Sequence, residues 1–179
     1  MEIVLSSASP RRAQLLRMLG LEFTVKPSSK EETAIEGVSP EEMVMALARS
    51  KAADEGDVVI SADTIVYYDG RVFGKPKNEN DAFDMLRTLS GNTHAVYTGI
   101  CVNGKCDYEK TLVTFRELSD DEIWSYIKSG EPMDKAGAYG AQGKGALLIE
   151  KINGDFFNVM GLPISKLSLM LKEVGVRIL

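Results

Sequence analysis

Hydrophobic residues along this chain alternate between short continuous runs and helically spaced sets. The run Ile3-Val4-Leu5 indicates a buried strand, and residues 13–19 repeat apolar side chains at the spacing of a helix. Between them, Ser9 suits the N-cap and Pro10 the first turn of that helix, while Gly20 suits its end. The opening of the chain therefore predicts a strand, a tight serine-rich turn and a helix.

The same two patterns recur along the rest of the chain. The strongest strand signal is residues 57–67, whose Val-Val-Ile run is typical of a central strand buried on both faces. The other patterns predict strands at 22–25, 71–73, about 95–103 and about 106–118, and helices at 39–53, 79–89, 119–130 and 164–174. Strands that alternate with helices around a long hairpin predict a mixed α/β fold, in a single domain that covers residues 1–179.

Composition and charge argue against a membrane or a nucleic-acid polymer as the partner of this chain. The 179 residues are 44% hydrophobic and 26% charged, as in ordinary globular proteins, and no apolar run approaches the roughly 20 residues of a membrane helix. The sequence shows no signal peptide, so we expect a cytoplasmic protein without a membrane partner. A net charge of −5 argues against binding to a nucleic-acid polymer. A small polyanionic ligand would require positive charge gathered in one cleft.

Two cysteines, Cys101 and Cys106, flank the turn signal Asn103-Gly104. A hairpin at this turn would place them opposite each other, so its geometry permits a disulfide. Because a reducing cytosol disfavours such bonds, we expect two free thiols. Their spacing matches no zinc pattern, and His94 is the only histidine that could complete such a site.

The start of the first predicted helix has the features of an anion site. It offers free backbone N–H groups, serine hydroxyls and two adjacent arginines, Arg11 and Arg12. Arginine matches phosphate oxygens well, and two cations at a helix N-terminus oppose the helix dipole unless an anion compensates them. An ordinary cap with solvated charges is the alternative, and we favour the phosphate site.

Other polar residues add candidate chemistry. Asp63 lies late in the predicted central strand, where a carboxylate either holds a metal or cation or makes structural hydrogen bonds. Lys75 lies in a Gly-Lys-Pro turn, and Gln142 in the glycine-rich segment carries an amide that can recognise a nucleobase edge. Lys51 is ambiguous between a functional cation and a solvated helix lysine, and for the loop pair Glu31-Glu32 the residues alone favour a solvated charge run.

These residues include no Ser/His/Asp or Cys/His set for nucleophilic catalysis. Cations, carboxylates and a helix N-terminus together suit metal-assisted attack of water on a phosphate ester or anhydride.

Taken in order, the motifs of the chain resemble those of the Maf family of nucleoside triphosphate pyrophosphatases. They span nearly the whole chain, and the ordered set is far more specific than any one of them. The matching pieces lie at residues 7–12, 32–33, 50–52, 61–64, 74–76, 89–91, 94, 97–99, 134–140, 142–143 and 153–164.

The resemblance implies a fold shared with inosine triphosphate pyrophosphatases, with a long mixed sheet in two lobes and a cleft between them. It also implies hydrolysis of a nucleoside triphosphate to the monophosphate and pyrophosphate with a divalent cation, Mg²⁺ or Mn²⁺. A cytoplasmic homodimer, removal of noncanonical nucleotides and a link to septum formation are further family properties.

Residue by residue, the resemblance makes Asp63 the catalytic acid/base and assigns the metal to Glu32 and Asp63. It places Arg12, Lys51 and Lys75 on the phosphates, with Ser9 at the helix start that seats them. It ties Arg11, Thr64 and Gln142 to substrate choice. The sequence departs from the family pattern in the lead-in Lys30-Glu31, so the choice between Glu31 and Glu32 stays open.

The glutamine at position 142 is typical of the branch that prefers dTTP and UTP. The neighbouring Ala141 replaces a larger apolar residue of the family, which bears on the shape of the base pocket. The alternatives are a pyrophosphatase for 7-methyl-GTP or other modified purines, and a non-enzymatic nucleotide-binding regulator of septum formation.

Overall fold

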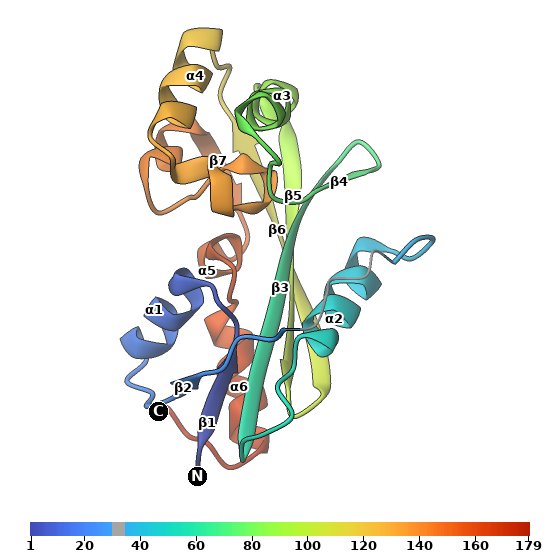
Figure 1. Cartoon of the computed structure of the whole chain (residues 1–179), viewed down its shortest axis with the longest axis vertical. Helices are drawn as coiled ribbons and strands as arrows, with labels where there is room; N and C mark the ends of the chain where they lie inside the picture. Colours follow the sequence, from blue (N-terminus) through green and yellow to red (C-terminus); the bar gives the residue numbers. More distant parts are fainter. Residues whose placement is uncertain (30–34) are drawn as a thin grey trace. The chain divides into compact units, whose positions relative to one another are not determined.

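The computed structural model describes residues 1–29 and 35–179. Within these ranges it forms a mixed sheet of seven strands in the order β2-β1-β3-β5-β6-β7, with β4 also paired to β3 (Figure 1). The strands are β1 (Ile3–Ser6), β2 (Thr24–Val25), β3 (Val58–Tyr68), β4 (Arg71–Phe73), β5 (Thr93–Val102), β6 (Lys105–Phe115) and β7 (Ile149–Asn153). The α-helices are α1 (Pro10–Met18), α2 (Pro40–Ser50), α3 (Glu79–Leu89), α4 (Asp120–Lys128), α5 (Phe156–Met160) and α6 (Ile164–Glu173).

Strand β3 is the centre of the sheet, as its continuous apolar run predicts. It pairs in parallel with β1 from Val58 to Ser61 and antiparallel with β4 from Val66 to Tyr68. Strands β5 and β6 are neighbours joined by the two-residue turn Asn103-Gly104, and both turn residues have positive φ. The predicted hairpin is therefore confirmed.

The chain divides into two compact units. Unit 1 comprises residues 1–64, 98–109 and 161–179, and unit 2 comprises residues 65–97 and 110–160. A single domain over the whole chain stays a prediction, as does a cleft between two lobes. The mixed α/β class is confirmed.

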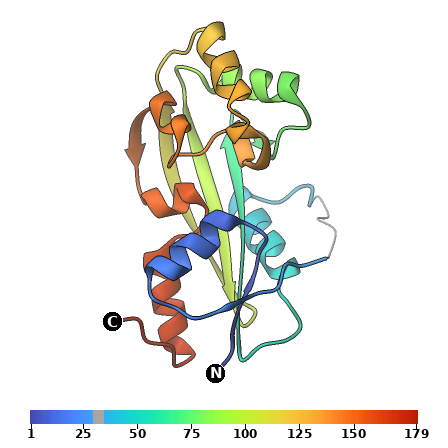
Figure 2. The ribbon, with the colours of Figure 1, turned by 60° about the vertical axis from the view of Figure 1, so that its left-hand side comes forward.

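In unit 1, helix α2 covers one face of the sheet and helices α1 and α6 cover the other (Figure 1, Figure 2). Ser39 and Glu42 form a reciprocal capping box at the start of α2. Helix α2 comes very close to β5 at Gly99, where an added Cβ would lie 2.1 Å from the carbonyl oxygen of Val44. The absence of a side chain at Gly99 thus sets how close α2 lies to the sheet.

In unit 2, helix α3 packs against α4, and the rings of Phe83 and Trp124 stack with centroids 4.7 Å apart. The core below them contains His94, which is 1% exposed and makes a 2.6 Å hydrogen bond between its Nε2 and the hydroxyl of Tyr139. The Phe115 ring packs edge-on against both of these rings. His94 is therefore a core residue of unit 2.

Three short 3₁₀-helices lie in and around the glycine-rich region of residues 135–145: η1 (Glu131–Asp134), η2 (Ala136–Ala138) and η3 (Lys144–Leu148). The sequence patterns predicted no helix there. They also missed the short helix α5 and the strand β7, whose residues lack clear periodicity. Among the described residues, no helix is long and apolar enough to cross a membrane.

The cysteine expectation is wrong. Cys101 and Cys106 form a disulfide across the β5–β6 hairpin, with their Cα atoms 4.1 Å apart. The tight two-residue turn places the two residues opposite each other on adjacent strands, within the distance that a disulfide spans. The expectation of free thiols gave the reducing cytosol more weight than this proximity.

We predict that Gly99→Ala lowers the free energy of unfolding by about 3 kcal/mol, because the new methyl group overlaps the α2 backbone. Urea denaturation would measure it. Gly74→Ala is the control, because Gly74 has open space around its Cβ position. Equal stability of the two variants would contradict the close approach of α2.

Burial lowers the pKa of His94 from 6.5 to about 3. Between these two values the unfolded chain binds a proton that the folded chain excludes, so stability falls as pH falls through this window. Each pH unit costs up to about 1.4 kcal/mol. We expect the stability advantage of wild type over His94→Gln to shrink between pH 7 and pH 4.

Denaturant unfolding at each pH measures this difference, and NMR can follow the only imidazole of the chain directly. An imidazole that titrates near pH 6.5 in the folded protein would contradict the prediction.

Candidate functional site

The turn between β1 and α1 is organised by Ser7. Its Oγ accepts hydrogen bonds from the backbone N–H of Ser9 at 3.2 Å and from Nη1 of Arg12 at 3.0 Å. Ser9 occupies the N-cap position, as predicted, but its side chain makes no capping hydrogen bond. The hydroxyl that orders this turn is therefore that of Ser7.

Arg12 ties three distant segments of unit 1 together. Besides Ser7, its guanidinium donates from Nε to the carbonyl oxygen of Gly161 at 2.7 Å and from Nη2 to Oγ1 of Thr64 at 3.0 Å. Thr64 in turn lies 2.9 Å from Oγ1 of Thr98 on β5. Arg12 is 8% exposed, and a buried guanidinium is costly unless its donors are satisfied. These contacts fix its position and orientation.

Arg12 and its partners form one cluster of polar side chains, and Asp63 and Lys51 form a second. Lys51 is the C-cap of α2, and its Nζ makes an ion pair with Oδ1 of Asp63, which is 7% exposed. Two hydroxyls hold the end of α2 against the sheet: Ser61 donates to the carbonyl oxygen of Ala48, and Ser6 donates to that of Lys51. The structure thus places a cation beside the candidate catalytic carboxylate.

The two clusters approach β3 from opposite faces. Asp63 and Thr64 are adjacent in the strand, so their side chains point to opposite sides of the sheet. Both residues lie just beyond Ser61, the last residue of β3 that pairs with β1. The sequence patterns did not anticipate this division, although the two-residue period of a strand contains the signal for it.

Lys75 and Gln142 belong to unit 2, where both are exposed. The turn that carries Lys75 is joined to the glycine-rich region, because the N–H of Gly137 donates to the carbonyl oxygen of Gly74 at 3.1 Å. Unit 2 therefore brings these two predicted regions together. The joint action of Lys75 and Gln142 with the residues of unit 1 stays a prediction.

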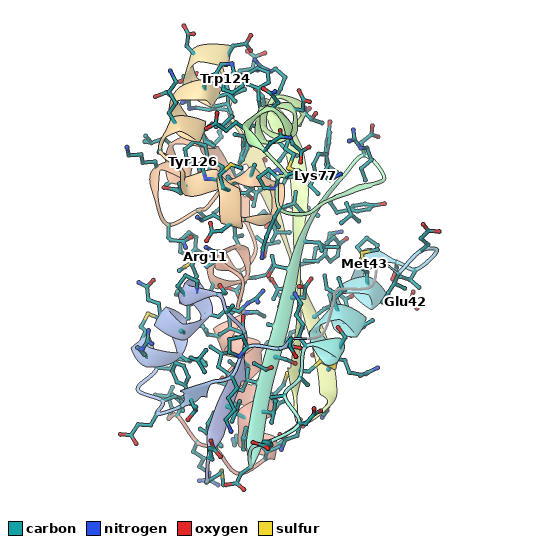
Figure 3. The ribbon with its side chains drawn as sticks, in the orientation of Figure 1. Arg11, Glu42, Met43, Lys77, Trp124 and Tyr126 are labelled. Carbon is teal, nitrogen blue, oxygen red and sulfur yellow. A yellow bond between two sulfur atoms is a disulfide. The ribbon has the colours of Figure 1, made fainter. Side chains whose placement is uncertain are left out.

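The remaining predicted residues divide as follows. Arg11 lies at the start of α1 and is half-buried (Figure 3). Glu31 and Glu32 lie outside the described residues. Sequence reasoning did not assign functional roles to Ser7, Thr98 and Gly161, although all three lie in motifs that carry the family resemblance.

A model of the family described as "Maf-like protein" matches residues 2–174 of this chain. The chain belongs to the Maf family. The match covers both units and the segments that contribute Arg12, Lys51, Asp63 and Lys75, so the resemblance in the motifs is confirmed.

Several curated proteins named dTTP/UTP pyrophosphatase are similar to this Maf chain. The one from Caldicellulosiruptor saccharolyticus is 44% identical, over 97% of this chain and 95% of its own length. The one from Bacillus cereus (strain ATCC 10987) is 47% identical, over 98% and 91%. The one from Methanococcoides burtonii is 46% identical, over 99% of this chain and 97% of its own length.

We predict that Arg12→Lys lowers the free energy of unfolding by about 2 kcal/mol, because one ammonium group cannot reach the three oxygens that the guanidinium binds. Chemical denaturation measures the change, and Arg17→Lys, at an exposed position in the last turn of α1, is the matched control. A variant as stable as wild type would contradict the network.

Proposed function

We propose that this protein hydrolyses dTTP and UTP to the nucleoside monophosphate and pyrophosphate. The observation that carries the proposal is the buried carboxylate of Asp63 paired with Lys51, next to Thr64, which binds the buried guanidinium of Arg12. Relatives that align with almost the whole chain are named for this activity.

The triphosphate would lie across the edge of β3 beyond the end of β1. From one face it would meet the start of α1, with its free N–H groups, Arg11 and Arg12. From the other face it would meet Asp63 and Lys51. Because the pairing with β1 ends at Ser61, groups from both faces can approach one ligand at this edge.

The reaction is an in-line attack of water on the α-phosphorus. A bond forms between the water oxygen and the α-phosphorus, the bond from that phosphorus to the bridging oxygen breaks, and pyrophosphate leaves. Asp63 orients the water and takes its proton, while Lys51 and Lys75 offset the charge of the leaving pyrophosphate.

The donor set also fits a divalent cation such as Mg²⁺ or Mn²⁺. Mg²⁺ is commonly bound by one or two carboxylates together with substrate phosphates, and Asp63 supplies one such carboxylate. No cluster of three His, Cys, Asp or Glu residues exists within residues 1–29 and 35–179. We assign the cation to Asp63, Glu32 and the phosphates, as the family resemblance implies. When bound, it would stabilise the charge that develops on the phosphate oxygens.

Two further properties belong to the proposal. The amide of Gln142 recognises the pyrimidine, since it can both donate and accept hydrogen bonds. The protein works in the cytoplasm as a homodimer, and analytical ultracentrifugation of the purified protein would test the dimer.

A panel of nucleotides assayed for pyrophosphate release, with and without EDTA, tests the function. We expect turnover of dTTP and UTP that EDTA abolishes. Preferential turnover of 7-methyl-GTP would support the modified-purine alternative, and binding without turnover would support a non-enzymatic regulator. Either result would contradict the proposal.

We predict that Asp63→Asn lowers kcat for dTTP by about 100-fold or more, because an amide cannot accept the proton of the attacking water. Asp84→Asn, at an exposed position on α3, is the control. Steady-state assays at saturating metal measure both. Near-wild-type turnover by Asp63→Asn would exclude Asp63 both as base and as essential metal ligand.

A further inference from the structure

Two side chains outside the proposed site hold the segment that carries Gln142. They are Tyr126 on α4 and Glu131, the first residue of η1. Figure 3 labels Tyr126 on α4. Both belong to unit 2, together with the whole glycine-rich segment, so the arrangement is internal to one unit.

Tyr126 binds the beginning of the turn formed by residues 140–145. Its hydroxyl oxygen accepts a hydrogen bond from the backbone N–H of Gly140 at 3.0 Å and donates its proton to Oε1 of Glu131 at 2.8 Å. The side chain is 6% exposed. Burial raises the pKa of this hydroxyl far above its usual range, and the nearby Glu131 carboxylate adds to the effect. Tyr126 therefore remains a proton donor to Glu131 at every physiological pH.

Glu131 binds the end of the same turn. Its Oε1 accepts from the N–H of Gly145 at 3.0 Å, and its Oε2 accepts from the N–H of Lys144 at 2.9 Å. Burial acts to raise the pKa of this carboxyl, but the hydrogen bonds from Gly145, Tyr126 and Lys144 outweigh it and lower the pKa. The carboxylate thus caps the start of η3 in its ionised form.

The two side chains and the turn close into a ring of hydrogen bonds that spans residues 141–143, because its bonds to the turn are made by the N–H groups of Gly140, Lys144 and Gly145. The packing inside the ring is tight. An added Cβ on Gly143 would lie 2.4 Å from Oε2 of Glu131, and one on Gly145 would lie 2.7 Å from the Tyr126 hydroxyl. We call Tyr126 and Glu131 the clamp. A side chain at Gly143 or Gly145 would collide with the clamp, so glycine is required at both positions while the clamp stays in place.

We propose that Tyr126 and Glu131 are positioning residues for recognition of the pyrimidine base, because they fix the turn on which the exposed Gln142 is carried. This inference rests on the proposed function. An amide discriminates between bases only when it is held within about 0.5 Å of its productive position. Gln142 lies in the middle of the three residues that the clamp spans, so the clamp sets the place of its backbone.

The test compares Tyr126→Phe and Glu131→Gln with two matched controls, Tyr68→Phe and Glu150→Gln, which lie in the same unit. The measured quantities are kcat and KM for dTTP and for dGTP. We expect KM for dTTP to rise about 10-fold in each clamp variant, with kcat changed less than about 3-fold, as for the loss of one or two hydrogen bonds. We expect the preference for dTTP over dGTP to fall by a similar factor.

A double-mutant cycle separates positioning from general stability. In a Gln142→Ala background, Tyr126→Phe has no base-recognising amide left to displace, so we expect it to change the dTTP preference less than 2-fold. An equal effect in both backgrounds would contradict the proposal. Melting temperatures identify variants that fail to fold.

The remaining outcomes are also decisive. Clamp variants that keep the wild-type dTTP preference would overturn this inference while leaving the proposed function intact. Clamp variants that do not fold at all would overturn it too, since the contacts would then serve the stability of unit 2. A folded wild-type protein that releases no pyrophosphate from dTTP or UTP would instead contradict the proposed function itself.

Discussion

The buried guanidinium of Arg12 is the interaction on which the proposed phosphate site depends. A cation of this size is stable inside a protein only when its N–H groups find oxygen partners. Here the partners come from the turn after β1, from β3 and from Gly161 directly after α5, which are far apart in the sequence. Satisfying one side chain thus fixes the start of α1 relative to the central strand of unit 1.

A second constraint places the carboxylate. Helix α2 lies close to the sheet because Gly99 has no side chain, and the hydroxyls of Ser6 and Ser61 bind the carbonyl oxygens at its end. The C-cap residue Lys51 therefore meets Asp63 in a partly buried ion pair. Arg12, Lys51 and Asp63 are thus held out of bulk solvent, which would screen their charges. All three lie near the point along β3 where the pairing with β1 stops.

Local rules predicted much of this arrangement. The Asn103-Gly104 turn, the start of α1 at Pro10 and the start of α2 near residue 39 all follow from the conformations that these residues prefer. Other features depend on contacts between distant segments. The hydroxyl of Ser7, and not that of Ser9, orders the turn after β1, because Arg12 donates a hydrogen bond to it. The spacing of residues along the chain does not indicate this contact. The role of Glu131 likewise appears only once η1 and η3 come together.

The central claim is that the Arg12 cluster and the Lys51–Asp63 pair act on one triphosphate. A crystal structure with a nonhydrolysable α,β-methylene analogue of dTTP and Mg²⁺ tests it most directly. The account predicts phosphate oxygens within hydrogen-bonding distance of Arg12 and the first turn of α1, with the metal bound to Asp63. The account would be contradicted by an analogue that binds at the occupancy expected from its solution affinity but whose phosphates contact neither Arg12 nor the Lys51–Asp63 pair.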